Sequence, residues 1–212
     1  MTTIGILGTG RVGTNLGNAL ARAGHQIILG HRDSAEAPGA HTDPAIQYAP
    51  QAEAARTAEL VINATPGDGA LERLSALRPI LNGKTLIDLA NATADGPDGL
   101  PTGLLYPGSS LAEHLQQALP DTHVIKTLNT MLFTVMTDPH SLAAPPTVFL
   151  SGDDVAAKQT VKDLLADLGW KQEWMMDLGG IETARAAEAA ILFVPHVIRA
   201  QGFRPFAVSI AH

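Results

Sequence analysis

A glycine-rich hexapeptide near the N-terminus constrains the fold of this chain more than any other feature. Its residues are Gly8, Thr9, Gly10, Arg11, Val12 and Gly13. It follows the β-branched and leucine-rich run 3–7 and opens a segment, 12–23, whose apolar residues recur at spacings of three and four. A strand, this G-x-G-x-x-G turn and a helix, in that order, are typical of a dinucleotide site. Gly8 allows the tight turn, Gly10 lets a pyrophosphate approach the backbone, and Gly13 lets helix and strand pack closely. A tight turn without a cofactor is the alternative.

Strand-like and helix-like segments alternate along the rest of the chain. Apolar runs predict strands at 26–29, 46–49, 60–64, 85–89, 123–128, 147–150, 171–177 and 205–210. Helical patterns occupy 51–58, 70–81, 110–119, 156–168 and 181–200, the last with a kink at Pro195. Segment 94–109, which holds four glycines and three prolines, is expected to be a loop. The alternation predicts an α/β fold: a Rossmann-type, doubly wound, mostly parallel sheet with a small C-terminal α/β appendage. We expect a nucleotide-binding domain at 1–145 and a small C-terminal domain at 146–212.

Composition and charge exclude several classes of function. The chain carries 21 acidic and 14 basic residues, and its densest basic cluster is only His31-Arg32, so no nucleic-acid partner is expected. It has no cysteine, and none of its eight histidines lies in a metal-binding motif, His41 with Asp43 being the nearest approach; no metal is expected. The longest late apolar stretch, 189–194, is far shorter than the ~20 residues of a membrane span. We therefore expect a cytoplasmic protein without a membrane partner.

The end of the second expected strand distinguishes NAD from NADP. NAD-binding versions place a carboxylate there for the ribose hydroxyl. Here the strand ends in His31 and Arg32, and an imidazole with a guanidinium suits a 2′-phosphate through charge-assisted hydrogen bonds. Thr9 and Ser34 can add hydroxyl donors. We expect NADP(H) as cofactor, the alternative being that Arg32 is an ordinary solvated arginine.

The last expected strand has two unlike faces. One is large and apolar, and the other consists of Ala207, Ser209 and Ala211. Small side chains let another layer of the protein, or a flat cosubstrate, lie close to the backbone. We assign these three residues to the binding of a hydride acceptor, with ordinary core packing as the alternative.

Several segments together resemble the NADPH-dependent reductases of the deazaflavin coenzyme F420 and the related dinucleotide-binding domains of metalloreductases. They cover nearly the whole chain and read IGILGTGRVGTNLGNALARAGHQIILGHRD, VINATP, SSLAEHLQQALPDTHVIKTLNT, VFLSGDDVAAKQTVKDLLADLG and DLGGIETARAAE. The resemblance implies that NADPH lies across the strand ends and that a second ring system stacks on its nicotinamide. It also implies a small C-terminal domain that closes the cleft over the hydride acceptor.

The same resemblance implies further cofactor contacts. Thr9, His31 and Arg32 fall where the family meets the 2′-phosphate. Ala64, Thr65 and Pro66 fall at a strand-end loop near the pyrophosphate and the nicotinamide ribose. Asn91 and Asn129 fall at later strand ends that face the nicotinamide.

These observations predict an NADP-dependent oxidoreductase that passes hydride between NADPH and a flat conjugated acceptor, such as a deazaflavin or a flavin. Transfer between stacked rings depends on positioning and exclusion of water more than on an acid, so no catalytic side chain is assigned. A reductase of a small carbonyl or imine is the alternative, with His196, Tyr106 or Lys126 as candidate proton donors. A non-catalytic NADPH-binding sensor is a second alternative.

The long helix expected at 181–200 indicates self-association. It is rich in alanine and carries the apolar patch 191–194, so its apolar residues occupy more sides than one domain face needs. A partner subunit would cover the excess, and we expect a homodimer.

Overall fold

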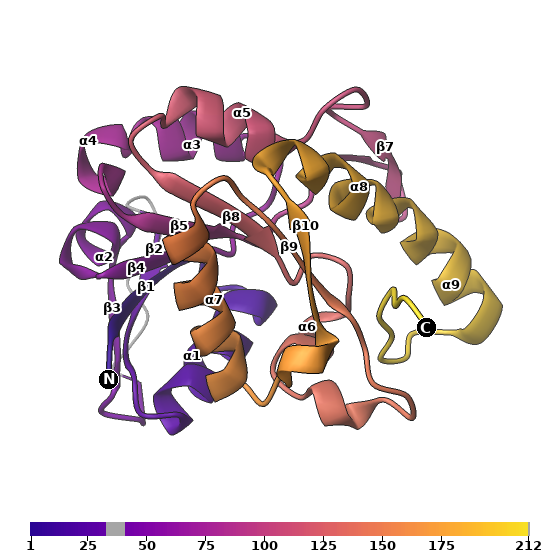
Figure 1. Cartoon of the computed structure of the whole chain (residues 1–212), viewed down its shortest axis with the longest axis horizontal. Coiled ribbons are helices and arrows are strands. Elements are labelled where there is room, and N and C mark those ends of the chain that lie inside the picture. Colours follow the sequence, from indigo (N-terminus) through magenta and orange to yellow (C-terminus); the bar gives the residue numbers. More distant parts are fainter. Residues whose placement is uncertain (33–40, 212) are drawn as a thin grey trace.

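A twisted sheet lies at the centre of the computed structural model, which describes residues 1–32 and 41–211 (Figure 1). Its strands are β1 (Thr3–Leu7), β2 (Gln26–His31), β3 (Ile46–Pro50), β4 (Leu60–Asn63), β5 (Thr85–Asp88), β8 (His123–Thr127), β9 (Val148–Ser151) and β10 (Met175–Gly179). They follow the order β10-β9-β8-β5-β4-β1-β2-β3. Every neighbouring pair is parallel except β8 with β9, which is antiparallel.

Helices cover both faces of this sheet, because its apolar strands expose hydrophobic side chains on both sides. The helices on one face are α1 (Arg11–Arg22), α6 (Phe133–Met136) and α7 (Val155–Asp167). Those on the other face are α2 (Gln51–Thr57), α3 (Ala70–Ser75), α4 (Arg78–Leu81) and α5 (Leu111–Ala118). Two buried apolar clusters result, one on each face. The predicted Rossmann-type, doubly wound fold is confirmed.

Strand order locates the crevice where a ligand can bind. From β1 the chain builds outward through β2 and β3, and then returns to β1's other side to continue through β4, β5 and β8. In open α/β sheets ligands bind at such a switch point, so we expect the binding crevice beyond the carboxyl ends of β1 and β4.

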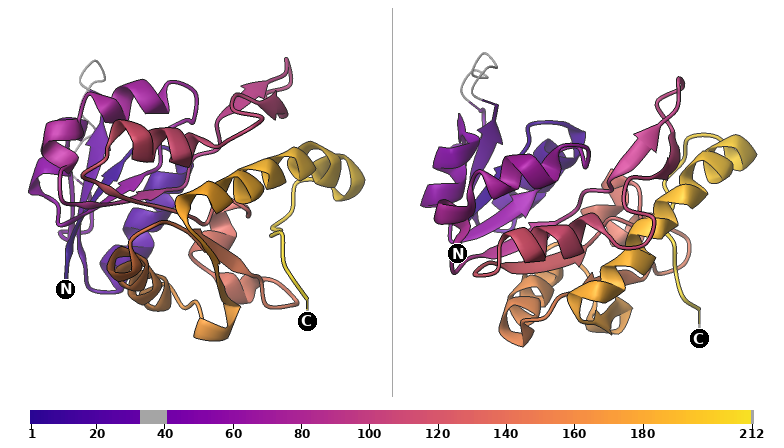
Figure 2. Two further views of the ribbon diagram at one scale, coloured as in Figure 1. Left: turned by 45° about the horizontal axis from the view of Figure 1, so that its top comes forward. Right: turned by 90° about the horizontal axis from the view of Figure 1, so that it is seen from above.

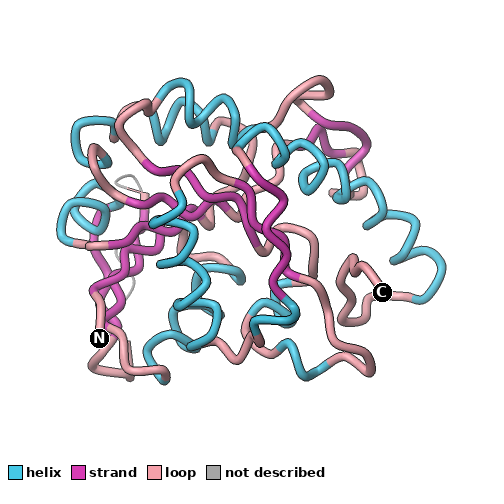
Figure 3. Tube along the Cα trace, viewed as in Figure 1, coloured by secondary structure: helices cyan, strands magenta, loops and turns pink. Residues whose placement is uncertain are grey.

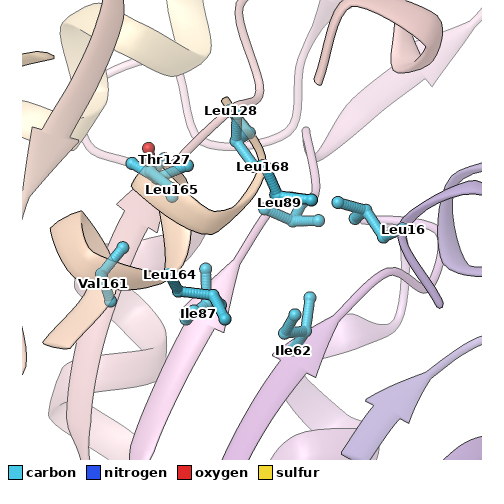
Figure 4. A pocket seen from close by; sticks show the side chains of 10 residues that line it. All are labelled: Leu16, Ile62, Ile87, Leu89, Thr127, Leu128, Val161, Leu164, Leu165 and Leu168. Atoms are coloured by element: carbon cyan, nitrogen blue, oxygen red, sulfur yellow. The ribbon is translucent and has the colours of Figure 1, made fainter. Parts of the chain in front are cut away.

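The C-terminal part of the chain extends the same sheet through β9 and β10. Val148 and Leu150 of β9 belong to the same buried cluster as Ile4 of β1 and Leu16 of α1. Leucine and valine side chains of α7 point toward the sheet around an internal space of about 10 Å³, roughly the room for one water molecule (Figure 4). The domain division expected after residue 145 falls between α6 and β9 and stays a prediction.

Prolines interrupt two of the expected helices. Segment 70–81 forms α3 and α4 instead of one helix, since Pro79 has no N–H to donate to the turn before it. Segment 181–200 begins with a 3₁₀ turn (Ile181–Thr183) and α8 (Ala184–Ala189). A second 3₁₀ turn (Ala190–Phe193) and α9 (Val194–Gln201) follow, and the tightened turn ends two residues before Pro195.

The loop predicted at 94–109 is wrong over part of its length. An antiparallel hairpin forms there from β6 (Thr93–Asp95) and β7 (Pro101–Leu104). Gly99 adopts φ +71°, which closes a turn between strands too short for an apolar pattern to reveal. The hairpin and α9 extend to the same side of the molecule (Figure 2), and the Arg199 guanidinium lies 3.8 Å from the Asp98 carboxylate.

The strand predicted at 205–210 is also wrong. The tail runs as a loop (Figure 3) and forms one isolated bridge, between Ala207 and Met131. Pro205 has no N–H for a ladder, and the partner segment 130–132 is itself irregular. In the part of the chain that the structure describes, no helix is long and apolar enough to cross a membrane.

Candidate active site at the strand ends

The glycines of the turn have two roles: Gly8 and Gly13 allow close packing, and Gly10 leaves open space. Gly8 has φ +120°, and a Cβ there would lie 2.6 Å from the carbonyl oxygen of Ala64. A Cβ at Gly13 would lie 2.0 Å from the carbonyl oxygen of Gly8. A Cβ at Gly10 would meet no atom within 4 Å, and no side chain caps the N-terminus of α1 there. The free N–H groups and open space fit a pyrophosphate.

An open depression of about 440 Å³ adjoins this turn. Asn15 and Phe133, which line it, were not predicted from the sequence. The Arg11 guanidinium carbon lies 5.7 Å from the centre of the Phe133 ring, a cation–π arrangement. Asn15 Nδ2 donates to the carbonyl of Phe133 at 2.9 Å and to Thr137 Oγ1 at 2.7 Å. These contacts hold Arg11 beside the expected pyrophosphate position. Asn15 lies 118 residues from Phe133 and 122 residues from Thr137 in the sequence, so no local pattern could have indicated these contacts.

The 2′-phosphate candidates lie where the ends of β1 and β2 meet. The N–H of Gly8 donates to the carbonyl of Gly30 at 2.9 Å, which brings Thr9 near the end of β2. His31 is buried, and its Nδ1 donates to the carbonyl of Arg32 at 3.0 Å. Thr9 and Arg32 are exposed. Ser34 lies outside the described residues, and the phosphate assignment stays a prediction.

The loop after β4 is fixed by side chains on both sides. Thr65 donates to Asn63 Oδ1 through its N–H at 3.2 Å and its hydroxyl at 2.6 Å. Arg73, which carried no sequence signal, donates to the carbonyl of Pro66 and lies 3.4 Å from Thr65 Oγ1. These contacts hold Ala64, Thr65 and Pro66 at the edge of the crevice.

Asn91 and Asn129, the two later candidates, bond to each other. Asn91 Nδ2 donates to the carbonyl of Asn129 at 3.0 Å, and Asn129 Nδ2 donates to Asn91 Oδ1 at 2.9 Å. Asn129 Oδ1 is buried without a partner and could accept a hydrogen bond from an amide such as a carboxamide. The preceding residue, Leu128, has φ +60°, a conformation that L side chains adopt only when their surroundings enforce it.

A network of buried charged side chains links the ends of β4, β5 and β8 to one another. Lys126 Nζ lies 2.7 Å from Asp88 Oδ2 and 3.0 Å from Glu188 Oε1, and it donates to the carbonyl of Ala90. Asp88 Oδ1 accepts from Asn63 Nδ2 at 2.7 Å, which connects the network to the Thr65 loop. The network therefore spans three neighbouring strands and α8.

Glu188 also joins α8 to α5. Its two carboxylate oxygens accept from the N–H groups of Leu111 at 3.0 Å and Ala112 at 3.2 Å, so it neutralises the positive end of α5. Burial alone would lower the pKa of Lys126, but the charges and hydrogen bonds of Asp88 and Glu188 outweigh it, and the pKa is raised. Lys126 thus stays protonated and fully engaged.

The three proton donors considered for a small-molecule reductase do not converge. Lys126 is enclosed at the sheet centre. His196 is exposed on α9. Tyr106 precedes α5, and its ring packs against that of His114 at a tilt of 39°, with the ring centres 4.3 Å apart. Within residues 1–32 and 41–211, no group of three or more His, Asp or Glu side chains is placed to hold a metal ion.

The three residues assigned to the hydride acceptor have separate surroundings. Ala207 packs against a buried core cluster, as the packing alternative expects. Ser209 Oγ accepts from the N–H of Thr147 at 3.2 Å, and Ala211 is exposed. Their assignment to the hydride acceptor stays a prediction.

Comparison with known proteins assigns a family to this arrangement. Residues 3–92 match the family "NADP oxidoreductase coenzyme F420-dependent". The F420-dependent NADP reductase of Methanothermobacter marburgensis is 30% identical over a 199-residue alignment that covers 85% of this chain and 85% of the relative. The chain belongs to this family. The crystal structure of a candidate F420-dependent NADP reductase from Arthrobacter sp. FB24 aligns with this chain over the full length of both proteins, with 38% sequence identity and a TM-score of 0.91.

Other relatives match over only part of their own length or share only the fold. Rat metalloreductase STEAP3 is 28% identical over 191 residues, and the chain spans 36% of its length. Pyrroline carboxylate reductase of Plasmodium falciparum, solved with NADP bound, has a TM-score of 0.60 at 14% identity, which shows the fold alone. The family of NADP-dependent oxidoreductases is therefore established, and the hydride acceptor is a separate question.

Proposed function

We propose that this protein transfers hydride between NADPH and a flat conjugated acceptor, a deazaflavin or a flavin. The observation that carries the proposal is the geometry of the crevice. An open glycine turn at an uncapped helix N-terminus lies at one end, and the Asn91–Asn129 pair, with its unpartnered Oδ1, lies at the other. A site for the pyrophosphate at one end and a site for the nicotinamide at the other suit a dinucleotide that lies across the strand ends.

The chain's own residues bind and orient the cofactor. The turn Gly8–Gly13 would hold the pyrophosphate, while Thr9, His31, Arg32 and Ser34 would hold the 2′-phosphate. The loop 64–66 and the asparagine pair would orient the nicotinamide end. NADPH, when bound, supplies two electrons and a proton as hydride and becomes NADP⁺, and the reduced ring takes its second proton from solvent.

The side chains at the strand ends favour a ring-shaped acceptor over a small carbonyl or imine. Ring-to-ring hydride transfer needs alignment and no side-chain acid. Reduction of a carbonyl or an imine needs a placed proton donor, and Lys126, the candidate nearest the strand ends, is sequestered by Asp88 and Glu188. The Methanothermobacter relative, named as F420-dependent, supports the same choice.

An anaerobic acceptor screen tests the proposal. NADPH oxidation is followed by absorbance with F420, FMN, FAD or a cyclic imine as acceptor. We expect turnover with a ring acceptor and its loss in Gly10→Val, whose branched side chain occupies the space next to the pyrophosphate. Turnover with the imine alone would favour the small-molecule reductase. NADPH binding without any turnover would favour the sensor.

A cytoplasmic location stays a prediction.

A further inference from the structure

A continuous chain of hydrogen bonds runs from Lys126, inside the sheet, to Thr65 at the edge of the crevice. The side chains of Lys126, Asp88 and Asn63 are buried, and Thr65 is half-buried. Lys126 Nζ donates to Asp88 Oδ2 at 2.7 Å, and Asn63 Nδ2 donates to Asp88 Oδ1 at 2.7 Å. Thr65 then donates to Asn63 Oδ1, through its hydroxyl at 2.6 Å and its N–H at 3.2 Å.

The chemistry of these groups fixes the direction of every bond in the chain. The ammonium of Lys126 can only donate, so Asp88 accepts from it as a carboxylate. A carboxylate has no proton to give, and therefore the part of the Asn63 amide that faces Asp88 must be its NH₂ group. The amide oxygen of Asn63 faces Thr65 for the same reason. Since that oxygen also carries no proton, the hydroxyl of Thr65 must supply the proton between them.

Thr65 Oγ1 is therefore left with lone pairs only. Arg73 Nη2, another group that can only donate, lies 3.4 Å from it, which fits this assignment. A hydroxyl in this state accepts hydrogen bonds and has none to give. It attracts O–H and N–H groups and repels the oxygens of a phosphate, whereas a threonine hydroxyl that is free to rotate serves either kind of partner.

The position of Thr65 determines which part of a dinucleotide it would meet. Thr65 lies beside the glycine turn, because a Cβ at Gly8 would come within 3.3 Å of its backbone nitrogen. A dinucleotide with its pyrophosphate on that turn and its nicotinamide at Asn91 and Asn129 would pass Thr65 between the two. The ribose of the nicotinamide half occupies that stretch of the cofactor. Its hydroxyls can donate a hydrogen bond, and the pyrophosphate oxygens cannot.

We propose that Lys126, Asp88 and Asn63 are positioning residues that take up the proton of Thr65 and so make its hydroxyl select the ribose hydroxyls of the cofactor over its phosphates. This inference rests on the NADP(H) site of the proposed function. A cofactor displaced by one phosphate along the crevice would place an anion against the lone pairs of Thr65. The buried charges thereby fix how far the nicotinamide reaches toward the asparagine pair.

Three nucleotides separate the parts of the cofactor in calorimetric titrations: NADP⁺, 2′-phospho-ADP-ribose, which lacks the nicotinamide, and 2′-phospho-ADP, which also lacks the ribose. Thr65→Val should weaken binding of the first two about tenfold, the value for one hydrogen bond, and leave the third unchanged. Thr65→Ser keeps the hydroxyl and should restore both. Thr122→Val is the matched control, since it removes a buried hydroxyl that donates to the carbonyl of Leu81 at 3.0 Å, and it should bind all three normally.

Asp88→Asn tests the chain of bonds itself. The new amide must turn its oxygen to Lys126 and its NH₂ group to Asn63, whose own amide must then turn its NH₂ group to Thr65. The N–H of Thr65 would face a donor, and its hydroxyl would no longer be held as an acceptor. We expect 2′-phospho-ADP-ribose to bind about tenfold more weakly, with no further loss when Thr65→Val is added, because coupled residues are not additive. Glu188→Gln, which alters a carboxylate bonded to Lys126 and to α5, is the control background, where Thr65→Val should cost the full tenfold.

The outcomes separate this inference from the proposed function. Equal weakening of all three nucleotides by Thr65→Val, or of NADP⁺ alone, would overturn the inference, because the hydroxyl would then act on the phosphates or on the carboxamide. A full tenfold effect of Thr65→Val in the Asp88→Asn background would overturn it as well; if that background does not fold, the three nucleotides decide. The expected pattern in a protein that oxidises no NADPH would support the inference and refute the proposed function. Turnover without the pattern would do the reverse, and an unmodified protein that binds none of the nucleotides would refute both.

Discussion

Replacing Lys126 by methionine would leave the carboxylates of Asp88 and Glu188 buried without their ammonium partner. The side chains of Lys126 and Asp88 are fully enclosed and that of Glu188 is 4% exposed, so water cannot substitute for the lost charge. Removing one partner of a buried ion pair costs about 3–5 kcal/mol. We expect the lower end, about 3 kcal/mol, because Asp88 keeps its bond from Asn63 and Glu188 keeps those from α5. In a chain of this size that lowers the melting temperature by roughly 6–12 °C.

Thermal and urea unfolding followed by circular dichroism measure this loss. Lys171→Met is the matched control, since Lys171 and Glu173 form an exposed pair at 4.0 Å that should contribute at most ~1 kcal/mol. Adding Asp88→Asn and Glu188→Gln to Lys126→Met removes the unpaired charges and should restore part of the stability. A Lys126→Met protein within ~1 kcal/mol of the unmodified one would refute the reasoning.

The pH dependence of the same variant follows from the direction of the pKa shift. Burial opposes the charge of Lys126, but the two carboxylates outweigh it and hold its pKa above the usual 10.5. A raised pKa contributes stability that is complete below the unfolded value and is lost only as the pH rises through the folded one. Titration of Lys126 itself should therefore add no pH dependence to the difference between Lys126→Met and the unmodified protein from about pH 6 to pH 9.

Further perturbations address other parts of the molecule. Arg32→Ala should weaken NADPH binding by about 10- to 150-fold, equivalent to ~1.5–3 kcal/mol, and leave NADH unaffected; equal losses in parallel titrations would contradict the 2′-phosphate assignment. Gly67→Ala should cost ~1–3 kcal/mol in urea unfolding and weaken NADPH binding, because its Cβ would lie 2.1 Å from the carbonyl oxygen of Asn91. Burial would raise the pKa of Asp177, but hydrogen bonds from Lys158 and a backbone N–H, with the charges of two lysines, lower it. Its stabilisation should thus be present at pH 7 and lost below about pH 4, so the deficit of Asp177→Asn should shrink there. The homodimer is checked by light scattering at tens of micromolar, where a monomer mass would contradict it.

The candidate cofactor turn is where sequence reasoning reaches furthest. Glycines report a local constraint: Gly8 needs a left-handed backbone, and Gly13 leaves no room for a side chain. Buried parallel strands are short unbroken apolar runs, so their positions and the Rossmann class follow from the order of residues alone. The start of α5 at Ser110 follows in the same way, because the Ser110 hydroxyl accepts from the N–H of Glu113 three residues later.

Elements that depend on a distant partner could not be predicted in this way. The hairpin β6–β7 has strands of three and four residues, too short to show a pattern, and the tail that was expected to be a strand forms a single bridge. Arg73, which holds the Thr65 loop, carries no signal in its own neighbourhood.

The nicotinamide side of the site belongs to the tertiary structure. Lys126 reads as an ordinary strand residue, and only the fold encloses it between Asp88 and Glu188. Asn129 bonds to a carbonyl 58 residues away on α8. Periodicity and turn chemistry encode local backbone geometry. Which side chains meet across the strand ends depends on how helices from the far end of the chain pack, and no local pattern carries that information.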